Sequence, residues 1–254
     1  MNVTDTLDDA EFDPDDAWPW FLEDALDAEL ATDRPYEELR AEFEDTPFIL
    51  RARALLEFVG EGREGTDEGV LTDADTVEIL QQLGIEREAT TMWDAPELIG
   101  PWLTLFDGDW VDVEGTRIVP GEGIAPAAHP DEDPETYALF VHALLSRLIG
   151  SMIERELDEG GFVGVPDSLA ALMVATRPEG LTMPHPEAVM KMDKDPDELG
   201  QYIDTLQDLS RLGLYGVLHS GEDERLHFRA PGIITDAIDA AVTAISQTLE
   251  DDDD

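Results

Sequence analysis

The sequence contains no cysteine, only 15 lysine and arginine residues, and no apolar run long enough to span a membrane. Without cysteine the chain can form no disulfide, no thiolate zinc site and no cysteine nucleophile. A bilayer span needs about 20 consecutive apolar residues, and the acidic N-terminus has neither the basic start nor the apolar stretch of a signal peptide. We therefore expect a soluble, cytoplasmic protein without membrane contact.

The chain does contain enough apolar residues for a core, and a large excess of acid. Its 254 residues are 42% hydrophobic, which suits one large domain or two of ordinary size. The 61 acidic residues give a formal net charge of -46, and this charge opposes approach to nucleic acid or anionic lipid. The acidity has three open interpretations: a solvated surface suited to a saline host, a face for a basic partner protein, or mimicry of nucleic-acid charge.

The first 46 residues form an acidic N-terminal segment with 17 carboxylates and only two arginines. Its apolar residues have the spacing of a short amphipathic helix. We expect a leader over 1–16 and one or two helices over 17–45 that pack on the body of the protein. The alternative is a docking segment, in which three aromatic residues contact a partner: Trp18, Trp20 and Phe21.

Residues 47–120 show the element order of a winged helix. Apolar periodicity and helix-end signals predict three helices, with a short extended piece after the first and a hairpin after the last. Thr72, followed three positions later by Asp75, forms a capping-box pattern at the start of the second helix. The predicted elements are helices over 47–59, 72–83 and 94–106, an extended piece at 70–71, and a hairpin over 110–119.

Residues 121–133 are a linker rich in glycine, proline and alanine, and a second helical domain is expected over 134–249. This half also contains a helix that leads directly into a hairpin, which makes structural duplication a reasonable hypothesis. Residues 250–254 form an acidic tail. We therefore predict a mainly α protein with small β-hairpins and two winged-helix-like halves. The second half is expected to contain helices from 133, 166, 196 and 231, an irregular stretch over 178–186, and hairpin strands over 214–219 and 225–229.

Residues 58–75 carry a pattern of glycines and polar residues after the first helix: Phe58, Val59, Gly60, Gly62, Arg63, Thr66, Gly69, Leu71, Ala74 and Asp75. The pattern resembles one in uncharacterised, largely actinobacterial proteins, some of them associated with plasmid-type genes. That resemblance implies an all-α or winged-helix-like module and no particular activity. From the residues alone we predict structural roles: Gly60 ends a helix, Gly62 and Gly69 permit positive φ, and Arg63 bonds to helix-end carbonyls or pairs with Asp75.

Motifs for phosphate, dinucleotide or zinc-hydrolase chemistry are missing from the sequence. His219 and His227 fall on opposite strands of the second hairpin, but a surface position is a better interpretation than a metal site. We predict no catalytic residue, no metal and no cofactor. An enzyme with a site between the halves, near His142 or His185, remains a weaker alternative.

The helices before the two hairpins offer carboxylates where a DNA reader needs cations. The first has no lysine or arginine and the second has only Arg211, while Lys191 and Lys194 alternate with acidic residues. We therefore predict a non-enzymatic protein-interaction or regulatory module, with a DNA-binding winged-helix regulator as an alternative. The acidic positions proposed to contact a basic partner are Glu97, Asp197 and Glu198.

Overall fold

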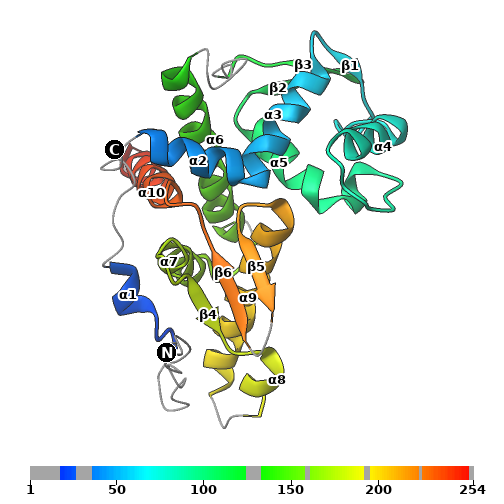
Figure 1. Cartoon of the computed structure of the whole chain (residues 1–254). Coiled ribbons are helices and arrows are strands. Elements are labelled where there is room, and N and C mark those ends of the chain that lie inside the picture. Colours follow the sequence, from blue (N-terminus) through cyan, green and yellow to red (C-terminus); the bar gives the residue numbers. More distant parts are fainter. Residues whose placement is uncertain are drawn as a thin grey trace, which may run out of the picture.

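A computed structural model describes residues 18–26, 36–123, 133–157, 161–191, 195–222 and 225–251 of the chain. These residues form a mainly helical fold with two small antiparallel sheets of three strands each (Figure 1), so the predicted mainly α class is confirmed. The predicted leader over 1–16, most of the linker and the last three residues of the tail lie outside the described residues.

The N-terminal segment contributes two helices, α1 (Leu22–Leu26) and α2 (Tyr36–Asp45). Helix α1 packs against α7 in the second half of the chain, and α2 packs against α3. Phe21, Ala25 and Phe43 are buried in the main core. The segment is therefore part of the folded body, as the first interpretation of its apolar residues predicts.

The first half follows the predicted order, with one displaced strand. Its sheet has the order β1-β3-β2. The extended piece expected at 70–71 is not a strand, because Leu71 makes only an isolated bridge to Gly65 and β1 lies earlier. The elements are α3 (Pro47–Val59), β1 (Arg63–Glu64), α4 (Asp73–Gln82), a 3-10 turn (Met92–Asp94), α5 (Pro96–Asp107), β2 (Val111–Glu114) and β3 (Arg117–Pro120).

The second half begins with the long helix α6, and its sheet has the order β4-β6-β5. The stretch predicted to be irregular contains the strand β4 and the short helix α8. The first hairpin strand starts at His219 rather than at residue 214, because α9 continues to Tyr215 and ends at Gly216 with a φ of 90°. The elements are α6 (Pro134–Leu157), α7 (Val165–Ala175), β4 (Leu181–Met183), α8 (Pro186–Val189), α9 (Pro196–Tyr215), β5 (His219–Glu222), β6 (Leu226–Arg229) and α10 (Ile234–Asp251).

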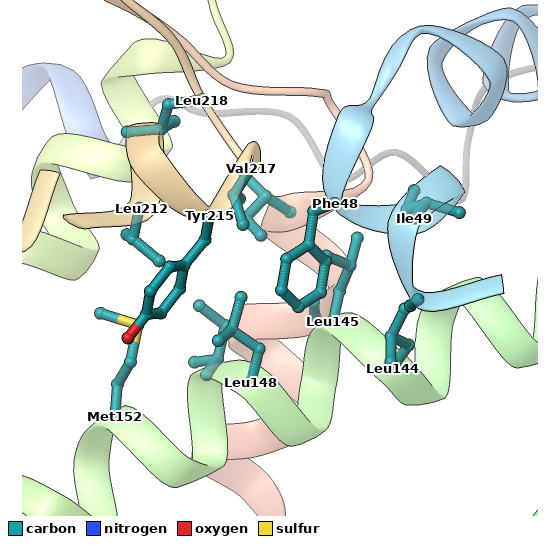
Figure 2. Packing of buried hydrophobic residues seen from close by; sticks show 14 of the residues in the cluster. Phe48, Ile49, Leu144, Leu145, Leu148, Met152, Leu212, Tyr215, Val217 and Leu218 are labelled. Atoms are coloured by element: carbon teal, nitrogen blue, oxygen red, sulfur yellow. The ribbon is translucent and has the colours of Figure 1, made fainter. Parts of the chain in front are cut away.

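One continuous hydrophobic core joins the two halves, and α6 contributes a long row of its side chains. Figure 2 shows side chains of α6 pointing toward Phe48 of α3 and Tyr215 of α9. Among the described residues α6 alone is long and apolar enough to cross a membrane, and 56% of its apolar window is buried inside the protein, as in a core helix. The labelled residues from α6 are Leu144, Leu145, Leu148 and Met152.

Two glycines allow α9 to approach the first half closely. A Cβ atom at Gly100 of α5 would lie 2.3 Å from Cγ of Tyr215, a separation that packed atoms do not reach. At the end of α9, a Cβ atom at Gly216 would lie 2.8 Å from Cβ of Pro47, and the Gly216 carbonyl accepts a hydrogen bond of 3.0 Å from the backbone N–H of Phe48. These contacts bury α5 and fix the C-terminal end of α9.

Candidate docking groove beside helix α9

The outward face of α9 is free of charge. Ile203 and Leu214 are 36% and 49% exposed, and Gln207 and Ser210 between them are also exposed. These four residues, which we call the α9 stripe, occur at i, i+4, i+7 and i+11 and therefore share one face of the helix. In a chain in which 30% of residues are charged, a neutral exposed row of this length is a distinctive feature.

A groove of about 470 Å³ lies between the C-terminal part of the α9 stripe, Ser210 and Leu214, and the second hairpin; we call it the α9 groove. Two glycines leave the space open: a Cβ atom at Gly221 would meet nothing within 4 Å, and one at Gly213 would lie 3.6 Å from Oγ of Ser220. Apolar side chains from α9 and β6 supply much of the wall. The lining residues are Ser210, Gly213, Leu214, Ser220, Gly221, Leu226 and Phe228.

The lining suits binding better than catalysis. The described part of the lining contains no residue that titrates near neutral pH, so it offers neither a general acid nor a general base. The only side-chain polar groups among these described lining residues are the hydroxyls of Ser210 and Ser220. Within the described residues no group of three or more histidine, aspartate or glutamate side chains could hold a metal ion. A ligand here would be held by apolar burial and hydrogen bonds.

The opposite face of α9 carries a buried carboxylate, that of Asp208. The Ser168 hydroxyl donates a hydrogen bond of 2.7 Å to its Oδ2, and the Val163 backbone N–H donates one of 3.4 Å to its Oδ1. Burial raises the pKa of Asp208 to about 6, and the bond from Ser168 opposes this shift. Because Asp208 is fully buried, it connects α9 to the start of α7 and is not available to a substrate.

The three aromatic residues of the docking alternative pack on the body of the protein. The Trp18 indole N–H donates a hydrogen bond of 2.8 Å to Asp167 Oδ2, and its ring contacts Tyr202 edge to face. Phe21 is only 1% exposed, and Trp18 and Trp20 are partly buried against the same core. These contacts place apolar surface of the three aromatic residues on α7 and α9, and their role as a partner contact stays a prediction.

The predicted acidic contacts do not form one face. Glu97 forms an ion pair of 2.6 Å with Arg87, and its side chain is 14% exposed. Burial lowers the pKa of Arg51, and the nearby carboxylate of Glu97 opposes this shift. The Arg51 guanidinium donates hydrogen bonds to the carbonyls of Leu214 and Tyr215 at the end of α9. Asp197 and Glu198 lie in the first turn of that helix, which places them roughly 25 Å away along its axis. Glu97 therefore lies near the opposite end of α9 from Asp197 and Glu198, and the role of the three carboxylates as partner contacts stays a prediction.

Most arginines in the described parts of the chain bind other groups of the same protein. Seven form ion pairs with carboxylates, Arg117 donates to the carbonyl of Glu61, and the Arg211 guanidinium lies 4.7 Å from the centre of the Phe162 ring. A phosphate backbone needs available cations. The paired arginines are Arg40, Arg53, Arg63, Arg87, Arg147, Arg155 and Arg177.

The residues around Arg63 have structural roles. Arg63 Nε donates a hydrogen bond of 3.0 Å to the carbonyl of Phe58, its Nη1 binds the carboxylate of Asp75, and its guanidinium lies 3.7 Å from the centre of the Phe58 ring. The Thr72 hydroxyl accepts a hydrogen bond of 3.2 Å from the backbone N–H of Asp75 at the start of α4. Positive φ angles occur at all three glycines singled out in the sequence: Gly60, Gly62 and Gly69.

The two histidines of the second hairpin are not directly opposite each other. His219 pairs with Arg229, and His227 pairs with Gly221, while Nδ1 of His227 lies 3.2 Å from the Thr182 hydroxyl.

Comparison of the chain with protein-family models, curated protein sequences and solved structures found no match.

The strand predicted over 214–219 is wrong at its first residue, because Leu214 belongs to α9 and is exposed there, as Ile203 is. No distinct sequence signal marks this surface. Between residues 209 and 221 Arg211 is the only charged side chain, but the run includes the buried residues Leu212, Tyr215, Val217 and Leu218, so core packing accounts for much of it.

Proposed function

We propose that the protein is a non-enzymatic protein-interaction or regulatory module whose partner docks in the α9 groove. The observation that carries this proposal is the combination of a neutral, partly apolar helix face with an open groove beside it. Single exposed apolar residues are common on protein surfaces, but Leu214 borders a groove that Leu226 and Phe228 also line, and a partly apolar concavity is typical of a binding site. The absence of titratable groups from the lining favours binding over a reaction.

We further propose that two winged-helix-like units, α3 to β3 and α7 to β6, arose by duplication. Both units have the order helix, strand, helix, helix and two strands, and in both sheets the third strand lies between the first and the second. This equivalence, with the resemblance over residues 58–75, supports the assignment. Helices α5 and α9 then have equivalent positions, but α5 is largely buried whereas α9 presents an open face. Docking therefore belongs to the second unit.

The partner is expected to be basic around an apolar anchor. A net charge of -46 attracts cations over long range and repels a second copy of the same chain. The α9 stripe itself is neutral, so the direct contact has to be apolar, and the surrounding field would select and steer a positively charged protein. The same field, together with the internally bonded arginines, makes DNA a poor candidate.

Affinity capture with designed variants tests this function. Wild-type protein, the double variant Ile203→Glu/Leu214→Glu, and the control Val242→Glu are immobilised and exposed to an extract of the source cells. Val242 is an exposed valine on α10, so it controls for the loss of a surface apolar group. We expect a basic protein that binds wild type and the control at about 0.15 M salt, binds more weakly at about 1 M salt, and does not bind the double variant.

Two results would count against the proposal. One is that every captured protein binds the three forms equally, and the other is that nothing binds at either salt concentration. A salt-sensitive shift of labelled duplex DNA by wild type, lost in the double variant, would instead favour the DNA-binding alternative.

A further inference from the structure

The hairpin that borders the α9 groove contains an edge strand, β5. In the sheet order β4-β6-β5, β5 pairs with β6 alone among the described residues. Its first three residues, His219, Ser220 and Gly221, are exposed. An edge strand presents unpaired backbone N–H and C=O groups that can bind another extended chain. The last residue of β5, Glu222, is its one carboxylate, whereas the edge strand β2 of the first sheet carries two, Asp112 and Glu114, and charged side chains discourage pairing at an edge.

The register of the hairpin places this edge beside the groove. Ser220 pairs with Phe228, so the two side chains lie on the same face of the sheet, and both line the α9 groove. Leu226, two residues from Phe228, shares that face. A strand added at the free edge of β5 would continue the face, and alternate side chains of that strand would point into the groove toward α9.

From this geometry we propose that the occupant of the α9 groove is an extended segment of a partner protein that adds to the edge of β5. An uncharged apolar side chain of the segment fills the groove, backbone hydrogen bonds to β5 hold the segment in register, and lysine or arginine residues flank the apolar anchor. This inference rests on the proposed function and specifies how the partner binds. Gly221 favours the arrangement, because a backbone without a side chain can approach closely.

The chemistry of the anchor follows from the lining. Leu214, Leu226 and Phe228 provide apolar contact, and the two serine hydroxyls can satisfy backbone groups at the rim. A buried charge would find no partner in this lining and would be strongly disfavoured. The basic flanks match the excess of carboxylates on the molecule as a whole. A second copy of this chain is a poor occupant, since two acidic surfaces would meet.

Peptide binding measured by fluorescence anisotropy tests the inference. The probes are labelled synthetic peptides of about ten residues with alternating threonine and valine, arginine at both ends, and leucine, valine, phenylalanine or serine at the centre. A matched set carries N-methyl groups on alternate residues, in both possible phases, which removes backbone donors without changing charge. The protein forms are wild type, Gly213→Leu, which fills the groove, and Gly200→Leu, a control on the same helix where a Cβ atom meets nothing within 4 Å.

We expect peptides with an apolar centre to bind wild type and Gly200→Leu. Binding is expected to weaken at least about tenfold for Gly213→Leu, for the serine peptide and for one phase of N-methylation. Amide hydrogen exchange in β5 should slow when the peptide binds. If both phases of N-methylation leave affinity unchanged while Gly213→Leu weakens it, strand addition is refuted and docking in the groove survives. If no peptide binds, although a captured partner still depends on Leu214, the extended segment is refuted while the proposed function stands.

Discussion

At the scale of single residues, the buried carboxylate of Asp208 makes the free energy of unfolding depend on pH in a defined range. Burial raises its pKa to about 6, whereas an aspartate in an unfolded chain titrates near 3.9. The folded protein therefore binds this proton more tightly than the unfolded chain, and the contribution of Asp208 to stability falls as the pH rises from about 4 to about 6. Above that range the ionised group costs the folded state roughly 2–3 kcal/mol.

We predict that Asp208→Asn raises the free energy of unfolding near pH 7 by roughly 1–3 kcal/mol, because the buried charge is removed while the shape is kept. The advantage over wild type should shrink toward pH 4, where Asp208 is increasingly protonated. Urea unfolding of both proteins across this pH range provides the measurement, and the difference between them cancels the other carboxylates. An equal difference at every pH would show that Asp208 does not titrate in this range.

The Ser168 hydroxyl offers the complementary test, because it donates directly to Asp208. Ser168→Ala leaves one carboxylate oxygen in the interior without its donor. We expect a loss of about 1–3 kcal/mol near pH 7 and a smaller loss near pH 4, where the carboxyl group is neutral. Urea unfolding at the two pH values measures both losses. A loss that does not depend on pH would assign the effect to packing alone.

Arg63 is the other residue on which local structure depends. Its planar guanidinium binds the Phe58 carbonyl, pairs with Asp75 and covers the Phe58 ring, which lysine cannot do in one conformation. We expect Arg63→Lys to lower the free energy of unfolding by about 1–2 kcal/mol. Arg117→Lys is the matched control, since the structure gives Arg117 one exposed hydrogen bond of 3.3 Å, and it should change stability by less than about 0.5 kcal/mol. Equal effects in urea unfolding would contradict the role assigned to Arg63.

At the scale of elements, the close packing of α5 against α9 depends on Gly100, which leaves room for the Tyr215 ring. Gly100→Ala places a Cβ atom where the Tyr215 ring lies, and we expect it to cost about 1–3 kcal/mol despite the higher helix propensity of alanine. Gly200→Ala, on the open side of α9, should stabilise by about 0.5–1 kcal/mol. Thermal unfolding of the two variants measures the contrast. A stabilising Gly100→Ala would mean that α5 and α9 are less closely packed.

Elements with strong local signals could be predicted from the sequence, and those that depend on distant contacts could not. The pairing of Arg63 with Asp75 and the capping of α4 by Thr72 connect residues close in sequence, so spacing was sufficient. Strand β4 is only three residues long and exists through its pairing with β6, 45 residues later in the chain. The burial of α5 depends on Gly100 meeting Tyr215, a contact that no local pattern encodes.

The α9 groove could not be predicted from the sequence because it too depends on contacts between distant segments. Ile203 and Leu214 are apolar, and periodicity assigns apolar residues to the core. Their exposure depends on where the second hairpin packs beside α9. The excess of carboxylates and the lack of catalytic motifs are properties of the sequence itself, and they still limit the classes of partner.

At the scale of the whole molecule, the net charge of -46 means that the folded state brings many like charges together. Salt screens this repulsion, with a Debye length of about 30 Å at 0.01 M and about 3 Å at 1 M. The unfolded chain spreads its charges more widely, so screening should favour the folded state. We therefore expect the midpoint of thermal unfolding to rise by at least about 5 °C between 0.01 M and 1 M sodium chloride, opposite to the trend for a fold stabilised mainly by surface ion pairs.

The control for this prediction separates screening from general stabilisation by solutes. Sucrose at matched osmolality stabilises proteins through exclusion from their surface but does not screen charge, so most of the rise seen with salt should be absent in sucrose. Differential scanning calorimetry in the two series measures the contrast. Because the seven ion pairs with arginine are weakened by the same salt, a midpoint that falls with sodium chloride would mean that these pairs outweigh the repulsion among the carboxylates. Repulsion among the carboxylates would then not be the dominant electrostatic effect, and the argument for a basic partner would lose its support.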